Sequence, residues 1–196
     1  MRLRLLFPFP PSLLCLSRLV VADQPSLSLS FPVLLSCPSL SNATFLFGGQ
    51  VAEDSLGVPD IWRYDTLTAS WTSLPPTNLP AYRNTSYLGA PAATCVGTTI
   101  YGTLPDGTFA SYDLLAHSWK PLAQQATPME GTALFALANG TILSVGKFNP
   151  INGTGAGRVS SAVEVFNWSS NSWSSGPAYL GPVTQAAGVA IGDVAY

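Results

Sequence analysis

The side chains that most often carry chemistry are scarce in this chain, and their spacing fits no common catalytic or metal site. His117 is the single histidine, and the three cysteines lack the short spacing of zinc ligands. No Gly-x-Ser turn marks a hydrolase nucleophile, and no glycine-rich loop leads into a helix that could hold a phosphate. We expect His117 to lie in an exposed turn, and the sequence predicts neither a bound metal nor a cofactor.

Acidic side chains are the other candidates, because a glycosidase needs two of them on facing strand ends. Asp65 and Asp113 occupy equivalent places in a repeat, where opening a turn accounts for both. Glu164 lies between two valines and is expected to project outward from its strand. The remaining acids near strand ends are Asp60 and Asp106. We expect these acids to be structural or solvated, and the chain to be non-enzymatic.

Composition favours an all-β protein and excludes some partners. Charged residues make up 9% of the chain and hydrophobic residues 47%, with 17 glycines and 17 prolines, which suits short strands and turns. The net charge is −2, and lysine and arginine occur singly, so we expect no nucleic-acid partner. No apolar stretch long enough for a membrane span is free of proline and charge.

The glycosylation sequons indicate a compartment. Five of the eight asparagines lie in Asn-x-Ser/Thr sequons, namely Asn42, Asn84, Asn139, Asn152 and Asn167. This excess predicts N-glycosylation and entry into the secretory pathway, with an extracellular or cell-surface location. Asn-Gly-Thr at two of these sites also fits a plain turn. Cys37 with Cys95 is the one disulfide left if Cys15 is cleaved off, and a buried free thiol at Cys95 is the alternative.

Residues 1–41 differ from the rest, being rich in Leu, Ser, Pro and Phe, and they form a separate low-complexity segment. One interpretation is a signal peptide, with Arg2 and Arg4 before an apolar stretch and small residues up to Ala22. The other is wrongly translated non-coding sequence joined to a real domain. We place the folded part at residues 42–196.

An internal repeat is the most informative feature of the chain. An aromatic residue, then Asp or Asn, then five residues and a tryptophan occur three times. The copies are Tyr64-Asp65 with Trp71, Tyr112-Asp113 with Trp119, and Phe166-Asn167 with Trp173. The period of about fifty residues is typical of propeller blades.

Each copy predicts a β-hairpin with an aromatic residue on either strand. Upstream of each hairpin an apolar run closes on glycine, at Gly48-Gly49, Gly102 and Gly146, where backbones are expected to crowd. Two of these runs follow a further strand, so we predict four strands per repeat. Residues 186–196 begin a fourth copy.

These residues resemble the kelch repeat family, in which a strand closing on diglycine is followed by an aromatic residue and a tryptophan. The resemblance implies a β-propeller whose repeats are four-stranded blades with glycines near a central channel. The resemblance also extends to copper radical oxidases similar to galactose oxidase. Their copper site needs two histidines, and this chain, with one, cannot supply it. Three blades and a beginning do not close a ring of about four to eight blades. We therefore expect a partial propeller, either a fragment or a chain that self-associates to cover its open sides.

Loops are where we expect recognition, because propeller strands are scaffold. Residues 50–59, 102–107 and 147–161 should emerge on one face. The predicted binding residues are Gln50, Glu53, Asp54, Asp106, Lys147, Asn149 and Arg158. The expected function is a secreted or surface module that binds a protein or glycan. The alternative is the N-terminal fragment of a kelch-type copper radical oxidase whose catalytic residues are absent from this chain. A cytosolic kelch adaptor is disfavoured by the sequons.

Overall fold

The described part of the chain is built from β-strands. The computed structural model describes residues 18–20, 28–30, 33–37, 39–40, 42–48, 60–75, 77–80, 91–104, 106–125, 131–150, 157–183, 186 and 188–196. Within these ranges there is no helix long and apolar enough to cross a membrane.

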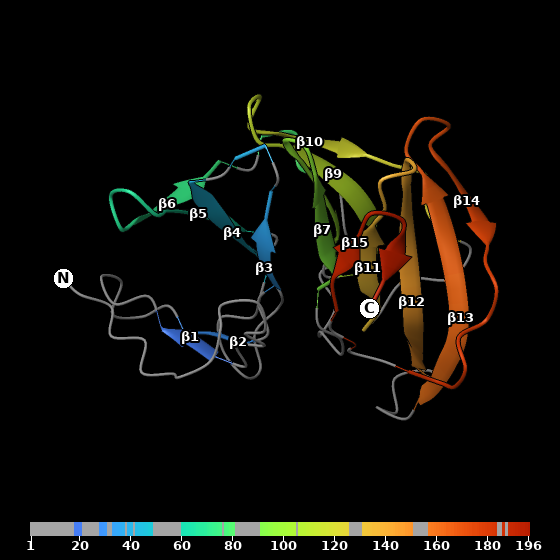
Figure 1. Cartoon of the computed structure of the whole chain (residues 1–196). Helices are drawn as coiled ribbons and strands as arrows, with labels where there is room; N and C mark the ends of the chain where they lie inside the picture. Colours follow the sequence, from blue (N-terminus) through green and yellow to red (C-terminus); the bar gives the residue numbers. More distant parts are fainter. Residues whose placement is uncertain are drawn as a thin grey trace.

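Three four-stranded antiparallel sheets follow one another along the chain, and in each the spatial order of strands is the chain order. Blade 1 consists of β3 (Val33–Ser36), β4 (Ala43–Phe47), β5 (Ile61–Asp65) and β6 (Ser70–Leu74). Blade 2 consists of β7 (Ala93–Val96), β8 (Thr99–Thr103), β9 (Phe109–Asp113) and β10 (Ser118–Pro121). Blade 3 consists of β11 (Ala133–Ala136), β12 (Thr141–Pro150), β13 (Gly157–Asn167) and β14 (Ser172–Ser175). Figure 1 shows the three blades in sequence order, which confirms the predicted partial propeller.

Two small sheets accompany the blades. β15 (Ala190–Ile191) pairs with β16 (Val194–Ala195) around the turn at Gly192, as expected for the start of a fourth copy. β1 (Arg18–Val20) pairs with β2 (Ser28–Ser30).

The repeated aromatic residues face each other across the third and fourth strands of each blade. Strand register places Tyr64 opposite Trp71, and the ring centroids are 5.0 Å apart. The Tyr112–Trp119 and Phe166–Trp173 pairs repeat this arrangement at 5.3 and 5.1 Å. The hairpins predicted from the repeat are confirmed.

The hydrophobic core lies between consecutive blades. Phe47 of blade 1 is fully buried and contacts the ring of Trp119 in blade 2, with centroids 6.0 Å apart. Phe109 of blade 2 meets Phe166 and Trp173 of blade 3, each at 5.0 Å. Each blade is therefore stabilised by its neighbour.

Glycine is required where the backbones approach most closely. A Cβ on Gly102 would lie 2.8 Å from the Phe47 ring, and one on Gly146 would collide with the carbonyl oxygen of Val183. These contacts confirm the expected crowding at the two glycines. Gly49 lies outside the described residues.

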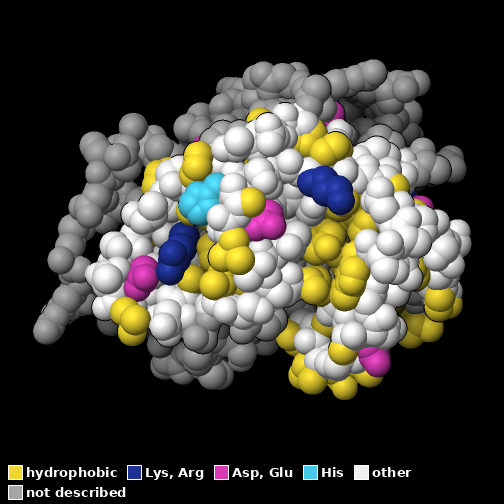
Figure 2. Space-filling model, turned by 90° about the horizontal axis from the view of Figure 1, so that it is seen from above, with side chains coloured by type: hydrophobic (Ala, Val, Ile, Leu, Met, Phe, Trp, Pro, Cys, Tyr) yellow, Lys and Arg dark blue, Asp and Glu magenta, His cyan; other side chains and the backbone are white. Residues whose placement is uncertain are grey.

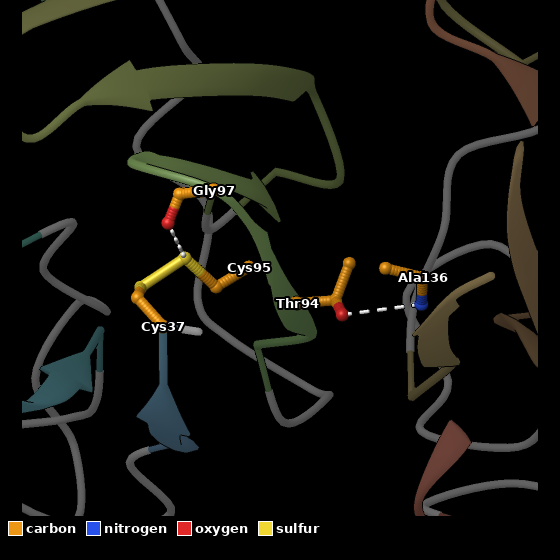
Figure 3. The surroundings of a disulfide bond; sticks show 5 residues. All are labelled: Cys37, Thr94, Cys95, Gly97 and Ala136. Atoms are coloured by element: carbon orange, nitrogen blue, oxygen red, sulfur yellow. Dashed lines mark hydrogen bonds between the residues drawn. A yellow bond between two sulfur atoms is a disulfide. The ribbon is translucent and has the colours of Figure 1, made fainter. Parts of the chain in front are cut away.

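The first strand of each blade, or the residues directly after it, is bonded to the next blade or hairpin. Cys37, just after β3, forms a disulfide with Cys95 on β7, so the structure selects the bridge over the free thiol (Figure 3). Between blades 2 and 3, the Ala136 N–H donates to Thr94 Oγ1 at 3.2 Å (Figure 3). Between blade 3 and the last hairpin, the Ala138 N–H donates to the Gly192 carbonyl at 2.9 Å.

The first blade begins upstream of the expected boundary at residue 42. β3 occupies Val33–Ser36, inside the segment assigned to low complexity, and pairs with β4 along its whole length. Its burial alternates along the strand, with Leu35 buried and its neighbours Leu34 and Ser36 exposed, although Leu occupies both the buried and the exposed position. A four-residue strand in Leu- and Ser-rich sequence has no periodic signal of its own, because its partner strand defines it.

The expected loop at residues 147–161 is mostly strand. β12 continues through Gly146 to Pro150, and β13 begins at Gly157, with Lys147 opposite Ser160 and Asn149 opposite Arg158. The register shifts between Val145 and Lys147, where Gly146 has φ +74°. A bulge of this kind keeps the pairing going past a glycine, so this glycine bends the strand and does not end it.

The disulfide should contribute measurably to stability. Replacing both Cys37 and Cys95 with serine removes a covalent link between residues 58 positions apart. We expect the free energy of unfolding to fall by about 2–4 kcal/mol in urea titrations without reductant. Cys15→Ser, which leaves the bridge intact, serves as the matched control. Equal stability of the double variant and the wild type would contradict the prediction.

Candidate binding surface

The acids and the asparagine of the repeat are used to build turns. Asp113 Oδ1 accepts hydrogen bonds from the N–H groups of Leu115 at 2.8 Å and Ala116 at 2.9 Å. Asp65 accepts the equivalent pair, and Asn167 does so with a neutral amide oxygen. These backbone hydrogen bonds lower the pKa of both Asp65 and Asp113. Carboxyls held ionised in this way are poor proton donors, which agrees with the structural role expected for them.

His117 is held by the same turn. It has φ +52°, and the equivalent residues Ala69 and Asn171 have φ +52° and +49°. The last residue of this four-residue turn must therefore be left-handed, whatever its side chain. The position of His117 is explained by backbone geometry, as a turn residue.

The buried phenol of the repeat is structural too. Tyr112 is fully buried, and its hydroxyl donates to the Pro75 carbonyl of the preceding blade at 2.9 Å. Burial, with a smaller effect of Asp113, raises the pKa of Tyr112 to about 12. No group of three or more histidine, cysteine or acidic residues that could hold a metal ion occurs in the part of the chain that the structure describes.

The two ends of the blades differ. We call the loop end the end at which the second strand of a blade connects to the third, and the turn end the opposite one. The loop end comprises the connections β4–β5, β8–β9 and β12–β13. Predicted binding residues Gln50, Glu53 and Asp54 belong to the first of these and lie outside the described residues.

Asp106 lies in the connection of blade 2. It is half-buried, and its Oδ1 accepts the N–H of Thr108 at 2.9 Å in a turn where Gly107 has φ +82°. Asp60, directly before β5, lies at the same end of blade 1, and its carbonyl accepts the N–H of Gly48 at 2.8 Å. Burial raises the pKa of the Asp60 carboxyl.

Lys147 is not on an exposed loop. It is 5% exposed, and its Nζ pairs with Glu164 Oε2 at 2.5 Å. The predicted outward position of Glu164 is therefore wrong, because its carboxylate turns to neutralise the buried ammonium group. An ion pair across β12 and β13 at this depth is a structural contact, and removing one partner would leave a buried charge.

Asn149 and Arg158 come together beyond this ion pair. They are opposite each other in the β12–β13 ladder, in the part that extends past Gly146. We call this extension, residues 148–150 of β12 and 157–159 of β13, the rim hairpin. Its base is held from the side, where the Val183 N–H donates to the Ser160 carbonyl at 3.2 Å. In Figure 1, β12 and β13 are the longest strands and reach down past the other blades.

The turn end of the described residues carries no cluster of like charges. Figure 2, seen from above, shows positive and negative side chains lying singly among uncharged and hydrophobic ones. The exposed Arg63 pairs with Asp65 of its own strand at 3.4 Å.

Several features of the site were not predicted. The Lys147–Glu164 pair has no sequence signal, since the residues are 17 positions apart and meet only through the bulged register. The hydrogen bonds between blades, such as Tyr112 to Pro75, join different repeats. Comparing equivalent positions of successive repeats could have suggested them.

Residues 33–78 match the family model of the Kelch motif. The match starts at the first residue of β3 and ends just beyond β6, so it covers blade 1. A search of curated proteins found no match to the chain.

The turn carboxylates should make stability depend on pH. Because the folded pKa of Asp113 lies below its ordinary value of 3.8, its stabilising effect is present above that value and is lost as the pH falls towards the folded pKa. The same holds for Asp65.

We therefore expect a variant with Asp65→Asn and Asp113→Asn to lose less stability than the wild type between about pH 5 and pH 3. Asn167 shows that the amide fits this turn, so stability near pH 7 should change little. Urea unfolding at both pH values measures the difference. Parallel losses in the two proteins would rule out this role for the carboxylates.

Proposed function

We propose that this chain, whose residues 33–78 match the Kelch motif and whose three blades repeat one pattern, is a non-enzymatic binding module that recognises a protein or glycan ligand with the loop end of its blades. The repeat residues support a scaffold role. The aspartates and His117 serve turn geometry, and Tyr112, Trp119 and Trp173 join blades. Recognition is then left to segments that the repeat does not constrain.

The rim hairpin carries the proposal. β12 and β13 have 10 and 11 residues, whereas the other strands of the blades have four or five. The extra length extends the β12–β13 ladder at the loop end, with Asn149 opposite Arg158 in the strand register. The residue types at these two paired positions, an amide and a guanidinium, are ones that hydrogen-bond to polar groups such as carbonyls and hydroxyls.

The positions of the described sequons also favour the loop end as the binding end. Asn42 and Asn139 are exposed in turns between first and second strands, and Asn167 lies in a turn between third and fourth strands. All three are at the turn end. Glycans on these residues would cover that end and leave the loop end open. Asn84 and Asn152 lie outside the described residues.

Passage through the secretory pathway completes the proposal. The Cys37–Cys95 disulfide joins two blades, and bridges of this kind persist in oxidising compartments. Together with the sequons, it favours an extracellular or cell-surface module. The side chain of Asn139 is available for modification, because its exposed amide accepts only the hydroxyl of Thr141 of the same sequon at 2.7 Å.

Shortening the rim hairpin should abolish binding. Residues 149–158 are replaced by Asn-Gly, which closes β12 and β13 from Phe148 to Val159 with a two-residue turn in the existing register. Lys147 and Glu164 are retained, so Tm should change little. Binding is measured on a printed glycan array and, by flow cytometry, on intact cultured cells.

We expect binding to weaken about tenfold or more in the shortened variant. Leu115→Ser at the turn end is the matched control and should bind like the wild type, since Leu115 is 73% exposed there. Undiminished binding by the shortened variant, or no binding of the wild type to either surface, would contradict the proposal.

Glycosylation is tested separately. The chain is expressed through the secretory pathway of cultured mammalian cells and treated with peptide N-glycosidase. We expect a drop in mass, smaller in Asn139→Gln and in Asn42→Gln. Thr141→Ala, which removes the sequon but keeps Asn139, should reproduce the effect of Asn139→Gln. An unchanged mass after treatment would refute the secretory proposal.

A further inference from the structure

Neighbouring blades are joined by one repeated contact. At the first junction, the hydroxyl of Tyr112 donates to the carbonyl of Pro75 at 2.9 Å. At the second, Trp173 Nε1 donates to the carbonyl of Ala123 at 2.8 Å. Pro75 and Ala123 are equivalent, since each follows the tryptophan of its own repeat by four residues. The aromatic pair of one blade therefore binds a fixed carbonyl in the segment that follows the preceding blade, which we call its tail.

Backbone contacts accompany each of these hydrogen bonds. The Trp119 N–H donates to the Thr77 carbonyl at 2.8 Å, and Thr77 forms a parallel bridge with Ser118. At the second junction, the Ala123 N–H donates to Asn171 Oδ1 at 2.9 Å. Both tails thus run in extended form along the aromatic hairpin of the next blade.

Blade 1 presents the same aromatic pair without a tail on it. Tyr64 is only half-buried, whereas its counterparts Tyr112 and Phe166 are 0% exposed. Trp71 is half-buried, as is its counterpart Trp173. Among the described residues, no tail carbonyl accepts a hydrogen bond from this pair. Blade 1 therefore offers the receiving half of the contact.

Blade 3 presents a tail without an aromatic pair on it. Its fourth residue after Trp173 is Pro177, which is exposed together with Ala178. Tyr179 is 54% exposed and Leu180 101% exposed, so large apolar side chains follow in solvent. The backbone of this tail is already fixed, because the Gly176 and Tyr179 N–H groups donate to the Val163 and Ser161 carbonyls at 2.8 Å.

We propose that the Tyr64–Trp71 hairpin of one molecule docks on the tail of blade 3, residues 176–180, of a second copy. The two surfaces are the two halves of a contact that the chain makes twice within itself, which is why the partner is another copy. Tyr64 Oη or Trp71 Nε1 donates to the carbonyl of Pro177, and the rings cover the apolar side chains of the tail. The proposal does not rest on the loop end.

The geometry sets the form of the assembly. The inner part of this side of blade 3 is held by β15–β16, bonded through Ala138 and Gly192, so docking uses the outer part. In blade 1 the outer strands β5 and β6 carry the aromatic pair. Because the two surfaces differ, the contact is heterologous and joins molecules head to tail.

Sedimentation velocity of the full chain tests the proposal, over about a hundredfold range of protein concentration. We expect the wild type to form dimers and longer species as concentration rises. Trp71→Ala removes the receiving surface, and Ala178→Arg places a charge on the exposed tail. Each variant should associate about tenfold more weakly or not at all. Tyr64→Phe, which removes only a hydroxyl, provides a milder change on blade 1.

Mixing separates this contact from nonspecific association. Trp71→Ala keeps an intact tail, and Ala178→Arg keeps an intact aromatic pair, so the mixture should form dimers of one copy of each that do not grow further. Tyr112→Phe, the same change at an internal junction, should lower Tm and leave association unchanged. A wild type that is monomeric throughout, variants that associate like it, or a mixture that does not pair would each overturn the proposal.

Discussion

The burial of an aromatic pair against the preceding tail is the contact on which the blades depend. A buried hydroxyl without an acceptor costs about 1–3 kcal/mol, so burying Tyr112 requires the carbonyl of Pro75 to be in place. In blade 3 the phenol is replaced by Phe166, which needs no acceptor, and Trp173 Nε1 becomes the donor instead. The donor changes and the position of the acceptor is kept, so the carbonyl is the fixed point around which consecutive blades are arranged.

This constraint decides which residues are available for recognition. A hairpin that must present two rings to its neighbour needs a turn of fixed shape, and the turn takes Asp65, Asp113 and Asn167 for its hydrogen bonds. It also takes His117 for its left-handed position. The aspartates and the histidine are residue types that often act in catalysis, but here their role is to build the turns of the scaffold. Only the segments at the loop end, where the rim hairpin extends, can vary in sequence and length without disturbing the contacts between blades.

The sequence predicted the repeated parts of the fold and not the parts that occur once. Three copies of the aromatic spacing predicted the hairpins, and the glycine-ending runs with the strands before them predicted four strands per repeat, because each copy supports the others. β3 was missed because Val33–Ser36 lies in a segment of biased composition, where its Leu and Ser residues do not stand out from their surroundings. The sequence around Gly146 predicts the end of a strand and therefore a loop at Lys147. In the structure a bulge at Gly146 lets β12 and β13 continue to pair beyond it. The choice between disulfide and free thiol depended on whether β3 and β7 are neighbours, which spacing alone does not tell.

The buried Lys147–Glu164 pair explains how the rim hairpin can be both long and well placed. An isolated two-stranded ribbon is marginally stable, so residues beyond the bulge need an anchor at their base. The bulge turns Lys147 inward, where only one register brings Glu164 close enough to neutralise it, and a slip by one residue would bury an unpaired charge. The pair therefore contributes specificity of register more than net stability. A base fixed in this way sets the strand register that pairs Asn149 with Arg158.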